Sequence, residues 1–332
     1  KKRIIDVGLI GFGYWAPNIA KNLFINLKIN LKWICDKNIE RIEKAKSIYA
    51  SQVNYSCEYK EIINDPNLDA VAIAVETSSH YKLVKQALKK GKHVFVEKPF
   101  TSTVKEAIEL DKLAKKLKLK IQVNHIMVYN SEINKIKDLI DKNYIGDILY
   151  IDAMRMNLGQ IRRDVSAMWD LALHDLVVID YLTKGKEPYF ISALGEKFYN
   201  PKESVSFLTM RYPGFISHIQ SSWISPKKER KLVIVGSKKM IIFDDQKMDE
   251  KLSIYDKGVN VVSGKNIEFG SYEVRTHEGD VWSPYIKKKD SLYVSLDSFV
   301  KIIQQDKQSS TGTDQAIRIQ KILEKADKRM NK

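Results

Sequence analysis

The chain has 332 residues, 44% of them hydrophobic, a length that exceeds one typical core and predicts two domains. No apolar run approaches the roughly 18 residues of a membrane span, and the opening KKRIIDVGLIG lacks the apolar stretch of a secretory leader. The two cysteines, Cys35 and Cys57, show no metal-ligand spacing and are too few for a disulfide framework. We therefore expect a cytoplasmic protein that holds no metal and contacts no membrane.

The formal net charge of +15 raises the question of an anionic partner. The lysines are scattered in pairs such as Lys89-Lys90 and Lys115-Lys116, without a basic stripe interleaved with aromatic residues. This pattern favours a solvated surface, with mild steering of an anionic ligand, over nucleic-acid binding.

The first 125 residues alternate strand-like and helix-like segments. Branched apolar runs, several of them bounded by glycine or proline, predict strands at 3–10, 31–36, 52–59, 69–75, 93–99 and 120–125. Helical spacing fits 17–24, 38–50, 79–91 and 103–119. Strands that alternate with helices of this length predict a parallel sheet, so residues 1–125 are expected to form an α/β dinucleotide-binding domain of the Rossmann type.

The pattern changes in residues 126–332. Helices are expected at 131–143, 168–182, 291–304 and 313–329, and strands at 147–157, 189–199, 204–212, 215–223, 230–236, 239–245 and 251–257. Turn signals such as Pro213-Gly214 separate successive strands, which predicts a mainly antiparallel open sheet. We expect an α+β domain for substrate binding and oligomerisation, with C-terminal helices that can pack back on the first domain. One uncovered sheet face favours a homo-oligomer.

The stretch Gly11-Phe12-Gly13-Tyr14-Trp15-Ala16 has the form G-x-G-x-x-A, directly after a predicted strand and opening a helix. Gly11 permits a tight turn, Gly13 lets the backbone approach a diphosphate, and Ala16 allows close helix packing. The helix N-terminus supplies free N–H groups for phosphate. A plain strand–turn–helix corner is the alternative explanation.

Asp36 ends the second predicted strand, where an acid accepts hydrogen bonds from the ribose diol of a dinucleotide. It would repel a 2′-phosphate, so NAD is favoured over NADP, although Lys37 follows immediately. A helix-capping acid is the alternative reading.

Two further patterns carry candidate chemistry. Glu97-Lys98-Pro99 closes the fifth predicted strand, at the carboxyl edge where open α/β sheets bind ligands, and a lysine there can stabilise negative charge on a substrate oxygen. An ordinary exposed loop lysine explains the spacing equally well.

Asp170 and His174 stand at i and i+4 of an apolar helix, so the acid can orient the imidazole as a general base. A structural hydrogen bond is the alternative there.

These elements, in this order, resemble the Gfo/Idh/MocA family of oxidoreductases along essentially the whole chain. GYWAPN, NHIMVYNSEINKIKDLI and RDVSAMWDLALHDL resemble segments of the branch of nucleotide-sugar 3-dehydrogenases that act on UDP-N-acetylglucosamine or its uronate. The resemblance implies a homo-oligomer, a dimer or tetramer, that uses NAD on a small-molecule nucleotide sugar or polyol.

The resemblance also implies roles for particular residues. The diphosphate turn and its surroundings would be Gly11, Gly13, Tyr14, Trp15, Ala16 and Glu97, with Asp36 on the adenosine ribose. Lys98 would bind the reacting hydroxyl, with His174 as base and Asp170 beside it. The substrate side would add His125 and Arg163.

The sequence departs from the branch at three places. Val75-Glu76 replaces a Thr-Pro pair after the fourth strand, which removes a hydroxyl and adds a negative charge near the cofactor path. Leu173 replaces a proline before His174, and Ala16 replaces a glycine. The expected reaction is oxidation of a sugar hydroxyl at C3. The alternatives are a 3-ketosugar reductase, an inositol-type polyol dehydrogenase, a non-catalytic NAD sensor and a nucleic-acid-binding protein.

Overall fold

A computed structural model of the chain describes residues 3–159, 161–163, 165–262 and 273–330. Its contacts divide the chain into two compact units, the first formed by Lys1–Asn130 with Lys289–Lys321 and the second by Ser131–Lys288 with Ile322–Lys332. A segment near the end of the chain thus belongs to the first unit. Among the described residues, no helix combines the length and the apolar character needed to cross a bilayer.

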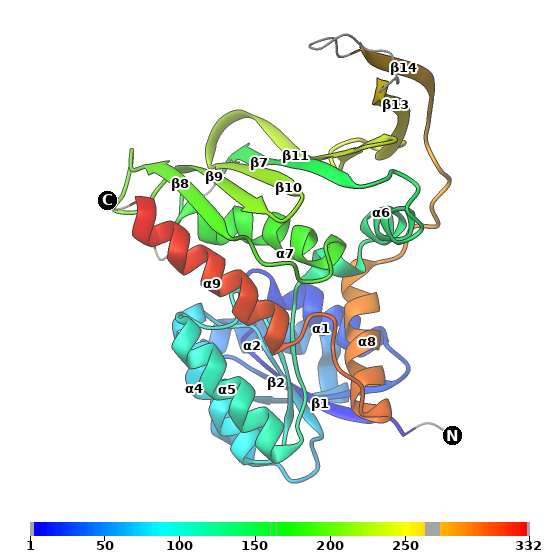
Figure 1. Ribbon diagram of the computed structural model, residues 1–332. Coiled ribbons are helices and arrows are strands. Elements are labelled where there is room, and N and C mark those ends of the chain that lie inside the picture. The colour runs from blue at the N-terminus through cyan, green and yellow to red at the C-terminus, as the bar shows by residue number, and fades with distance from the viewer. Residues whose placement is uncertain (1–2, 160, 164, 263–272, 331–332) are drawn as a thin grey trace. The chain divides into compact units, whose positions relative to one another are not determined.

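The first unit contains a six-stranded parallel sheet in the order β3-β2-β1-β4-β5-β6 (Figure 1). The strands are β1 (Ile5–Ile10), β2 (Ile29–Cys35), β3 (Asn54–Ser56), β4 (Ala70–Ile73), β5 (His93–Val96) and β6 (Ile121–Val123). The helices are α1 (Ala16–Ile25), α2 (Ile39–Tyr49), α3 (Tyr59–Asn64), α4 (Thr77–Lys89), α5 (Val104–Leu117) and α8 (Ser291–Gln305). The strand order reverses at β1, because β2 and β3 lie on one side of it and β4 to β6 on the other. Open parallel sheets bind ligands at this position.

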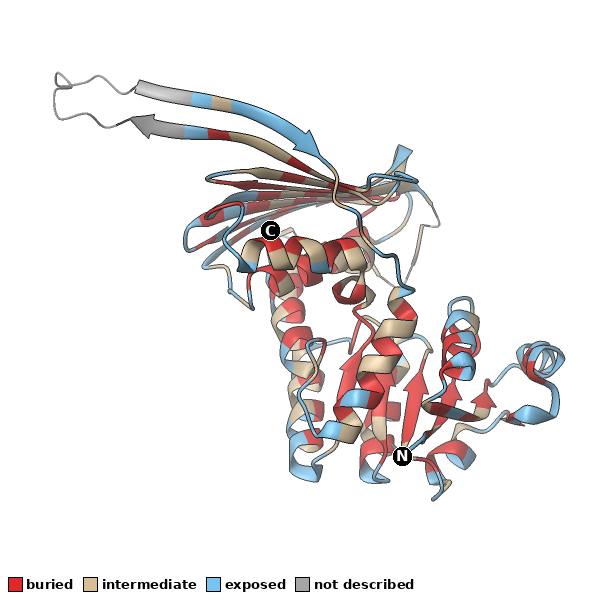
Figure 2. Cartoon of the chain, turned by 90° about the vertical axis from the view of Figure 1, so that its right-hand side faces the viewer, coloured by how far each residue is buried: buried red, intermediate tan, exposed pale blue. Residues whose placement is uncertain are grey.

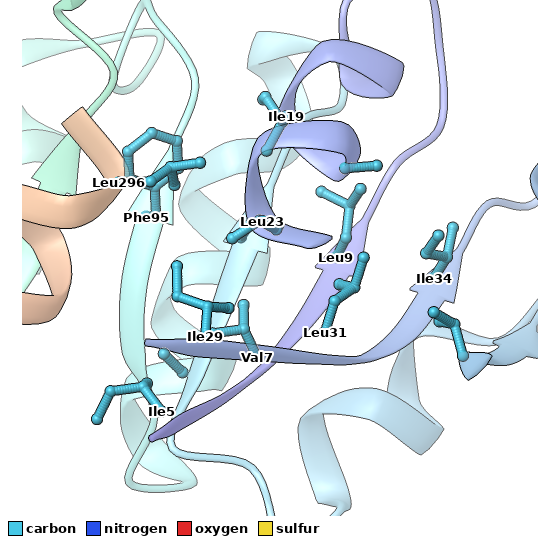
Figure 3. Packing of buried hydrophobic residues seen from close by; sticks show 14 of the residues in the cluster. Ile5, Val7, Leu9, Ile19, Leu23, Ile29, Leu31, Ile34, Phe95 and Leu296 are labelled. Carbon is cyan, nitrogen blue, oxygen red and sulfur yellow. The ribbon is translucent and has the colours of Figure 1, made fainter. Parts of the chain in front are cut away.

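Helices cover both faces of this sheet, which is why its strands are apolar along nearly their whole length. On one face, side chains of α1, α2 and α8 join alternate residues of β1 and β2 in a single core, part of which is drawn in Figure 3. On the other face, β4 and β5 pack against α3, α4 and α5. The edge-to-face contact of Phe95 with Phe299, whose ring centroids lie 5.7 Å apart, fixes α8 on the first of these faces.

The second unit contains an eight-stranded sheet in the order β14-β13-β12-β11-β7-β10-β9-β8, in which only the β7–β10 pair is parallel. Its strands are β7 (Ile148–Leu158), β8 (Phe190–Glu196), β9 (Val205–Tyr212), β10 (Phe215–Ser222), β11 (Ile224–Gly236), β12 (Met240–Asp244), β13 (Leu252–Val262) and β14 (Glu273–Trp282). Its helices are α6 (Ser131–Asp141) and α7 (Leu173–Leu182), and α9 (Thr313–Met330) ends in this unit. The predicted fold class, a Rossmann domain followed by an α+β domain with a mainly antiparallel sheet, is confirmed.

One face of the antiparallel sheet is buried and the other is exposed, as the alternation of buried and exposed residues along β8 and β9 indicates. Figure 2 colours the chain by burial. Buried residues such as Ala193, Leu208 and Ile219 share the face that packs on α7 and its neighbours. The paired residues Leu194 and Phe207 lie on the opposite face and are exposed.

Three elements differ from the sequence-based prediction. β11 begins at Ile224, before the predicted residue 230: Ile224 pairs with Leu158 and Glu229 with Met156 of β7, with a register shift between them, and its polar first half gave no apolar signal. β13 extends to Val262 and pairs with β14, a strand that the sequence did not predict because charged residues and glycine fill it. The short helix α3 also escaped prediction, since six residues give too little periodicity.

Candidate active site

Gly11 makes the sharp turn that ends β1. Its φ angle is +99°, a conformation that residues with a Cβ rarely adopt, and a Cβ there would lie 2.3 Å from the carbonyl oxygen of Ala74 at the end of β4. The Gly11 N–H donates to the Cys35 carbonyl of β2 at 2.7 Å. Three adjacent strands therefore meet at this residue, and only glycine fits.

Gly13 has a different environment. A Cβ built on it would meet only the Arg41 guanidinium, 3.7 Å away, so the backbone is open on this side. Helix α1 begins at the buried Ala16 with Pro17 in its first turn and has no side-chain cap, as is also true of α3 and α4, whereas α2, α5 and α8 are capped by side chains. An uncapped N-terminus beside an open glycine fits the diphosphate of a dinucleotide.

Asp36 stands directly after β2 and is buried. Its Oδ2 accepts from the Phe12 N–H at 2.7 Å, and its Oδ1 accepts from the Asn38 N–H at 2.9 Å. Nη1 of Arg41 lies 3.3 Å from the same Oδ2. The carboxylate thus fixes the glycine turn and the start of α2, and its ribose role stays a prediction.

Glu97 connects three strand ends in the first unit. Its Oε1 accepts from Asn124 Nδ2, after β6, at 2.6 Å, and its Oε2 accepts from the Lys98 backbone N–H at 3.2 Å. The side chain of Trp15, beside the glycine turn, is a further hydrogen-bond partner. Burial raises the pKa of Glu97, against the opposing effect of these bonds and of the Lys98 charge. Glu97 therefore holds the neighbouring lysine in place relative to the glycine turn.

Lys98 follows at the carboxyl end of β5 and is half-buried. The loop that carries it is clamped by His80 of α4, whose ring is fully buried. Nδ1 of His80 lies 2.9 Å from the Pro99 carbonyl oxygen, and Nε2 lies 3.1 Å from that of Val75. The imidazole thereby ties the loop after β4 to the loop that presents Lys98.

Glu76, one of the departures noted in the sequence, lies at the N-terminus of α4. Bonds from its own backbone N–H and from the Ser79 hydroxyl lower its pKa, so it is a charged carboxylate. Lys37 Nζ lies 3.9 Å from Glu76 Oε1, and both side chains are largely exposed. The added negative charge is therefore accompanied by a positive one.

His125 follows β6 at the same edge of the sheet but is only 3% exposed. Its Nδ1 lies within hydrogen-bond distance of Gln315 Oε1, at 2.9 Å. The substrate role of His125 stays a prediction, and its geometry shows in addition a packing role against α9.

In the second unit, Asp170 lies in a π-helical turn, Met168–Ala172, that leads into α7, and His174 lies in the first turn of α7. π-turns inside helices occur frequently at functional sites. Oδ1 of Asp170 accepts from Arg162 and Oδ2 from the indole N–H of the buried Trp223, each at 3.3 Å. Arg163, the predicted substrate residue, is exposed beside Arg162.

A buried ion pair fixes the start of α7 on the sheet. Arg155 of β7 donates from Nε and Nη2 to the two carboxylate oxygens of Asp175 at 3.0 and 2.8 Å. The two side chains are 9% and 6% exposed. Since Asp175 adjoins His174 in the chain, this pair sets the position of the candidate base.

The structure thus gathers the glycine turn, Asp36, Glu97, Lys98 and His125 at the carboxyl ends of the parallel strands in the first unit. It places Asp170, His174 and Arg163 in one region of the second unit. Sequence reasoning missed five partners of these residues, among them Gln315 beside His125. Trp223 and Gln315 gave no signal, and the others were visible only as neighbours of chosen residues: Arg41, Asn124 and Arg162.

Comparison with known proteins defines the class. Residues 5–125 match an oxidoreductase family with an NAD-binding Rossmann fold, and residues 133–242 match the GFO/IDH/MocA C-terminal domain. The chain belongs to the Gfo/Idh/MocA oxidoreductase family, and its first unit contains the NAD-binding Rossmann domain.

Several curated relatives carry names with substrates, and two of them represent the two substrate classes. The UDP-N-acetylglucosamine 3-dehydrogenase of Acidithiobacillus ferrooxidans is 26% identical over 238 residues, which is 71% of this chain and 70% of the relative. The inositol 2-dehydrogenase/D-chiro-inositol 3-dehydrogenase of Lactiplantibacillus plantarum is 26% identical over 183 residues, or 54% and 52% of the two chains. The chain spans about half the length of several curated relatives that it matches.

Solved structures share the fold along the whole chain. UDP-N-acetylglucosamine 3-dehydrogenase GnnA from A. ferrooxidans has a TM-score of 0.79 at 22% identity, with 98% of this chain and 97% of that chain covered. GenD2 from gentamicin A biosynthesis, in complex with NAD, has a TM-score of 0.82 at 16% identity, with 99% and 95% covered.

Proposed function

We propose that this protein is an NAD-dependent dehydrogenase that oxidises a sugar hydroxyl, at C3 of a UDP-N-acetylhexosamine or its uronate. The product would be a 3-keto nucleotide sugar for amino-sugar or surface-polysaccharide biosynthesis. The observation that carries the proposal is the position of Lys98 at the carboxyl end of β5, where its backbone N–H donates to Glu97, together with the open glycine turn after β1, which has no side-chain cap. The similarity to a UDP-N-acetylglucosamine 3-dehydrogenase supports the substrate class.

The residues of the first unit fit a dinucleotide. The backbone at Gly13 and the start of α1 would hold the diphosphate, and Asp36 would accept from the adenosine ribose. Bound NAD supplies the acceptor for the hydride that leaves the sugar carbon. Tyr14, which is 98% exposed, and Trp15 would border the cofactor.

Residues of the chain take up the hydroxyl proton and stabilise the negative charge on the reacting oxygen. Lys98 donates a hydrogen bond to the reacting hydroxyl and stabilises the negative charge that develops on its oxygen. His174 accepts the hydroxyl proton as the oxygen becomes a carbonyl, and Asp170 stabilises the charged imidazole. His125 and Arg163 complete the substrate side in this proposal.

The test is mass spectrometry on nucleotide sugars and free polyols incubated with the protein and NAD. We expect a product lighter by two hydrogens from UDP-N-acetylhexosamines alone. Lys98→Ala and His174→Ala should each lower turnover about 10²–10⁴-fold, whereas Lys105→Ala, an exposed lysine of α5, should leave it unchanged. Full activity of both site variants would refute the assigned roles.

A second candidate is an inositol-type polyol dehydrogenase, favoured by the similarity to the L. plantarum inositol dehydrogenase. Loss of two hydrogens from a free polyol would identify it. A 3-ketosugar reductase is the same chemistry in reverse, and oxidation of NADH by a 3-keto nucleotide sugar, with no forward turnover, would reveal it.

We also propose that the protein is a homo-oligomer. The exposed face of the antiparallel sheet carries neighbouring apolar pairs, Leu194 with Phe207 and Tyr150 with Ile216. Covering such a face removes apolar surface from water. Light scattering should report a dimer or tetramer, and Phe207→Glu should shift it toward the monomer.

A further inference from the structure

Asn124 follows β6 and is buried beside Glu97, with 2% of the residue exposed. Its Nδ2 donates to Glu97 Oε1 at 2.6 Å, and Glu97 Oε2 accepts from the Lys98 backbone N–H at 3.2 Å. The indole of Trp15, which can only donate, is a further partner of this carboxyl group. Both oxygens of Glu97 therefore already face N–H groups, and a proton placed on either oxygen would displace one of these bonds.

A row of buried polar side chains from β6 and α8 lies behind Asn124. Gln122 Nε2 lies 2.8 Å from the backbone carbonyl oxygen of Ser295, an acceptor that identifies this atom as the amide nitrogen. The same nitrogen lies 3.1 Å from Ser295 Oγ, which therefore accepts from it. The Ser295 hydroxyl directs its own proton to Asn124 Oδ1, at 3.5 Å. The amide of Asn124 is thus oriented with its oxygen toward Ser295 and its nitrogen toward Glu97.

The loop between α8 and α9 continues this row. Gln122 Oε1 can only accept, so the Ser309 hydroxyl donates to it at 3.3 Å. Ser309 Oγ in turn accepts from the backbone N–H of Thr311 at 3.1 Å. The row thus begins at a backbone donor, and each of its bonds points toward Glu97. Successive hydrogen bonds of one direction polarise each other, so the row strengthens Asn124 as a donor.

The charged and titratable groups around Glu97 act in the same sense. Burial raises the pKa of this carboxyl, and the bond from Asn124 is the largest of the effects that lower it, ahead of the charge of Lys98. Two histidines lie on neighbouring elements of the described chain. His80 contacts two backbone carbonyl oxygens, and His125 lies beside a side-chain amide. Asn124 is therefore the main neutral group that offsets the cost of burying a charged carboxylate here.

We propose that Asn124 is a positioning residue, which keeps Glu97 ionised and so holds the backbone of Lys98 in place. Gln122 and Ser295 support it by fixing the direction of its amide. Protonation of Glu97 breaks one of its bonds and loosens Lys98, so turnover falls at acidic pH. The inference rests on the proposed active site, but the charge of Glu97 is measurable without any substrate.

The test is carbon-13 NMR of the full-length protein, labelled at the glutamate side-chain carboxyl carbons and titrated with acid. Glu97→Gln identifies the Glu97 signal by its disappearance. Asn124→Leu keeps a similar volume without the donor, and should raise the pH at which this signal titrates by about one to two units, as expected for a lost hydrogen bond to a charged group. Ser295→Ala should raise it by less, because Asn124 keeps its donor and loses only the group that orients it.

Asn26→Leu is the matched control. Asn26 is as deeply buried, 1% exposed, but it precedes β2 at the amino edge of the sheet, where its side chain accepts from the Lys28 N–H. The control should leave the titration of Glu97 unchanged. With a substrate that turns over, the acidic limb of the pH profile of kcat should move upward in Asn124→Leu and stay in place in Asn26→Leu.

The possible outcomes separate the inference from the proposed function. An unmoved Glu97 titration in Asn124→Leu overturns the inference and leaves the proposed function intact. If Asn124→Leu does not fold, an unmoved titration in Ser295→Ala overturns it in the same way. If Glu97 titrates as expected but no sugar or polyol turns over, the role of Asn124 toward Glu97 stands and the proposed function fails.

Discussion

The candidate site residues are held in two different ways in the two units. At the edge of the parallel sheet, Asp36 and Glu97 accept from backbone N–H groups of the loops that follow the strands, in addition to the side chains of Arg41 and Asn124. In the second unit, Asp170 is held by side chains, Arg162 and Trp223, that come from other elements.

The difference has a physical origin. The ends of parallel strands converge on one edge whatever the side chains are, so the backbone itself places the functional groups there. A helix gives no such convergence, and the π-turn at Met168–Ala172 depends on its packing against the sheet. We infer that substitutions in the first region act mainly by changing the space available to the backbone. Substitutions in the second region act by removing a single side-chain partner.

The largest effect is expected for the ion pair under α7. Arg155→Met leaves the carboxylate of Asp175 buried without its bidentate partner, which typically costs about 3–5 kcal/mol of unfolding free energy. Urea denaturation should show this loss. The double variant Arg155→Met with Asp175→Leu removes both charges and should recover most of it. An additive further loss in the double variant would show that the pair is not the anchor.

The same difference explains which parts of the two regions could be predicted from the sequence. The fold class and the strand ends could be predicted because apolar runs, glycine punctuation and the parallel-sheet rule are local signals. Gly11, Asp36 and Lys98 were proposed in this way; the structure places them at strand ends, and their roles stay predictions.

The features that the sequence did not predict depend on contacts between distant segments. Nothing in the sequence places Trp223 beside Asp170, or Gln315 beside His125, because such contacts are set by how whole elements pack. The π-turn also lacks a sequence signal, since its residues have ordinary helical spacing. The polar strand β14 is defined by pairing with β13 alone.

The two glycines of the turn should separate folding from binding. Gly11→Ala forces a Cβ onto the Ala74 carbonyl at a positive φ, with strain and overpacking of about 1–3 kcal/mol each. Gly13→Ala meets open space, so stability should change little while NAD affinity falls, because the Cβ would stand where we propose that the diphosphate approaches. Thermal unfolding and calorimetry measure the two effects. Equal destabilisation by both variants would contradict the backbone account of this region.

A smaller effect is expected at Trp223. Trp223→Phe keeps most of the buried ring but removes the N–H that donates to Asp170, a loss of about 1–2 kcal/mol. If Asp170 supports the base, kcat should fall while KM for the cofactor stays constant. Trp33→Phe is the control, because its indole N–H donates to Asp65 in the first unit. A loss of kcat in the control of the same size would remove the link to Asp170.

The smallest predicted effect is a pH dependence that originates in the first unit. Burial lowers the pKa of His80 in the folded protein below its ordinary value near 6.5, against the opposing effect of the carbonyl contacts. The unfolded chain therefore binds the proton more readily, and stability should be lost as pH falls below about 6.5, by up to roughly 1 kcal/mol per pH unit. Burial lowers the pKa of His93 too, which adds a loss of the same sign. Urea midpoints between pH 7.5 and 5.5 should consequently fall less steeply for His80→Gln, with His93→Gln as the matched comparison. An unchanged slope in His80→Gln would mean that its clamp between Val75 and Pro99 does not respond to protonation, and that the loop bearing Lys98 is held by Glu97 alone.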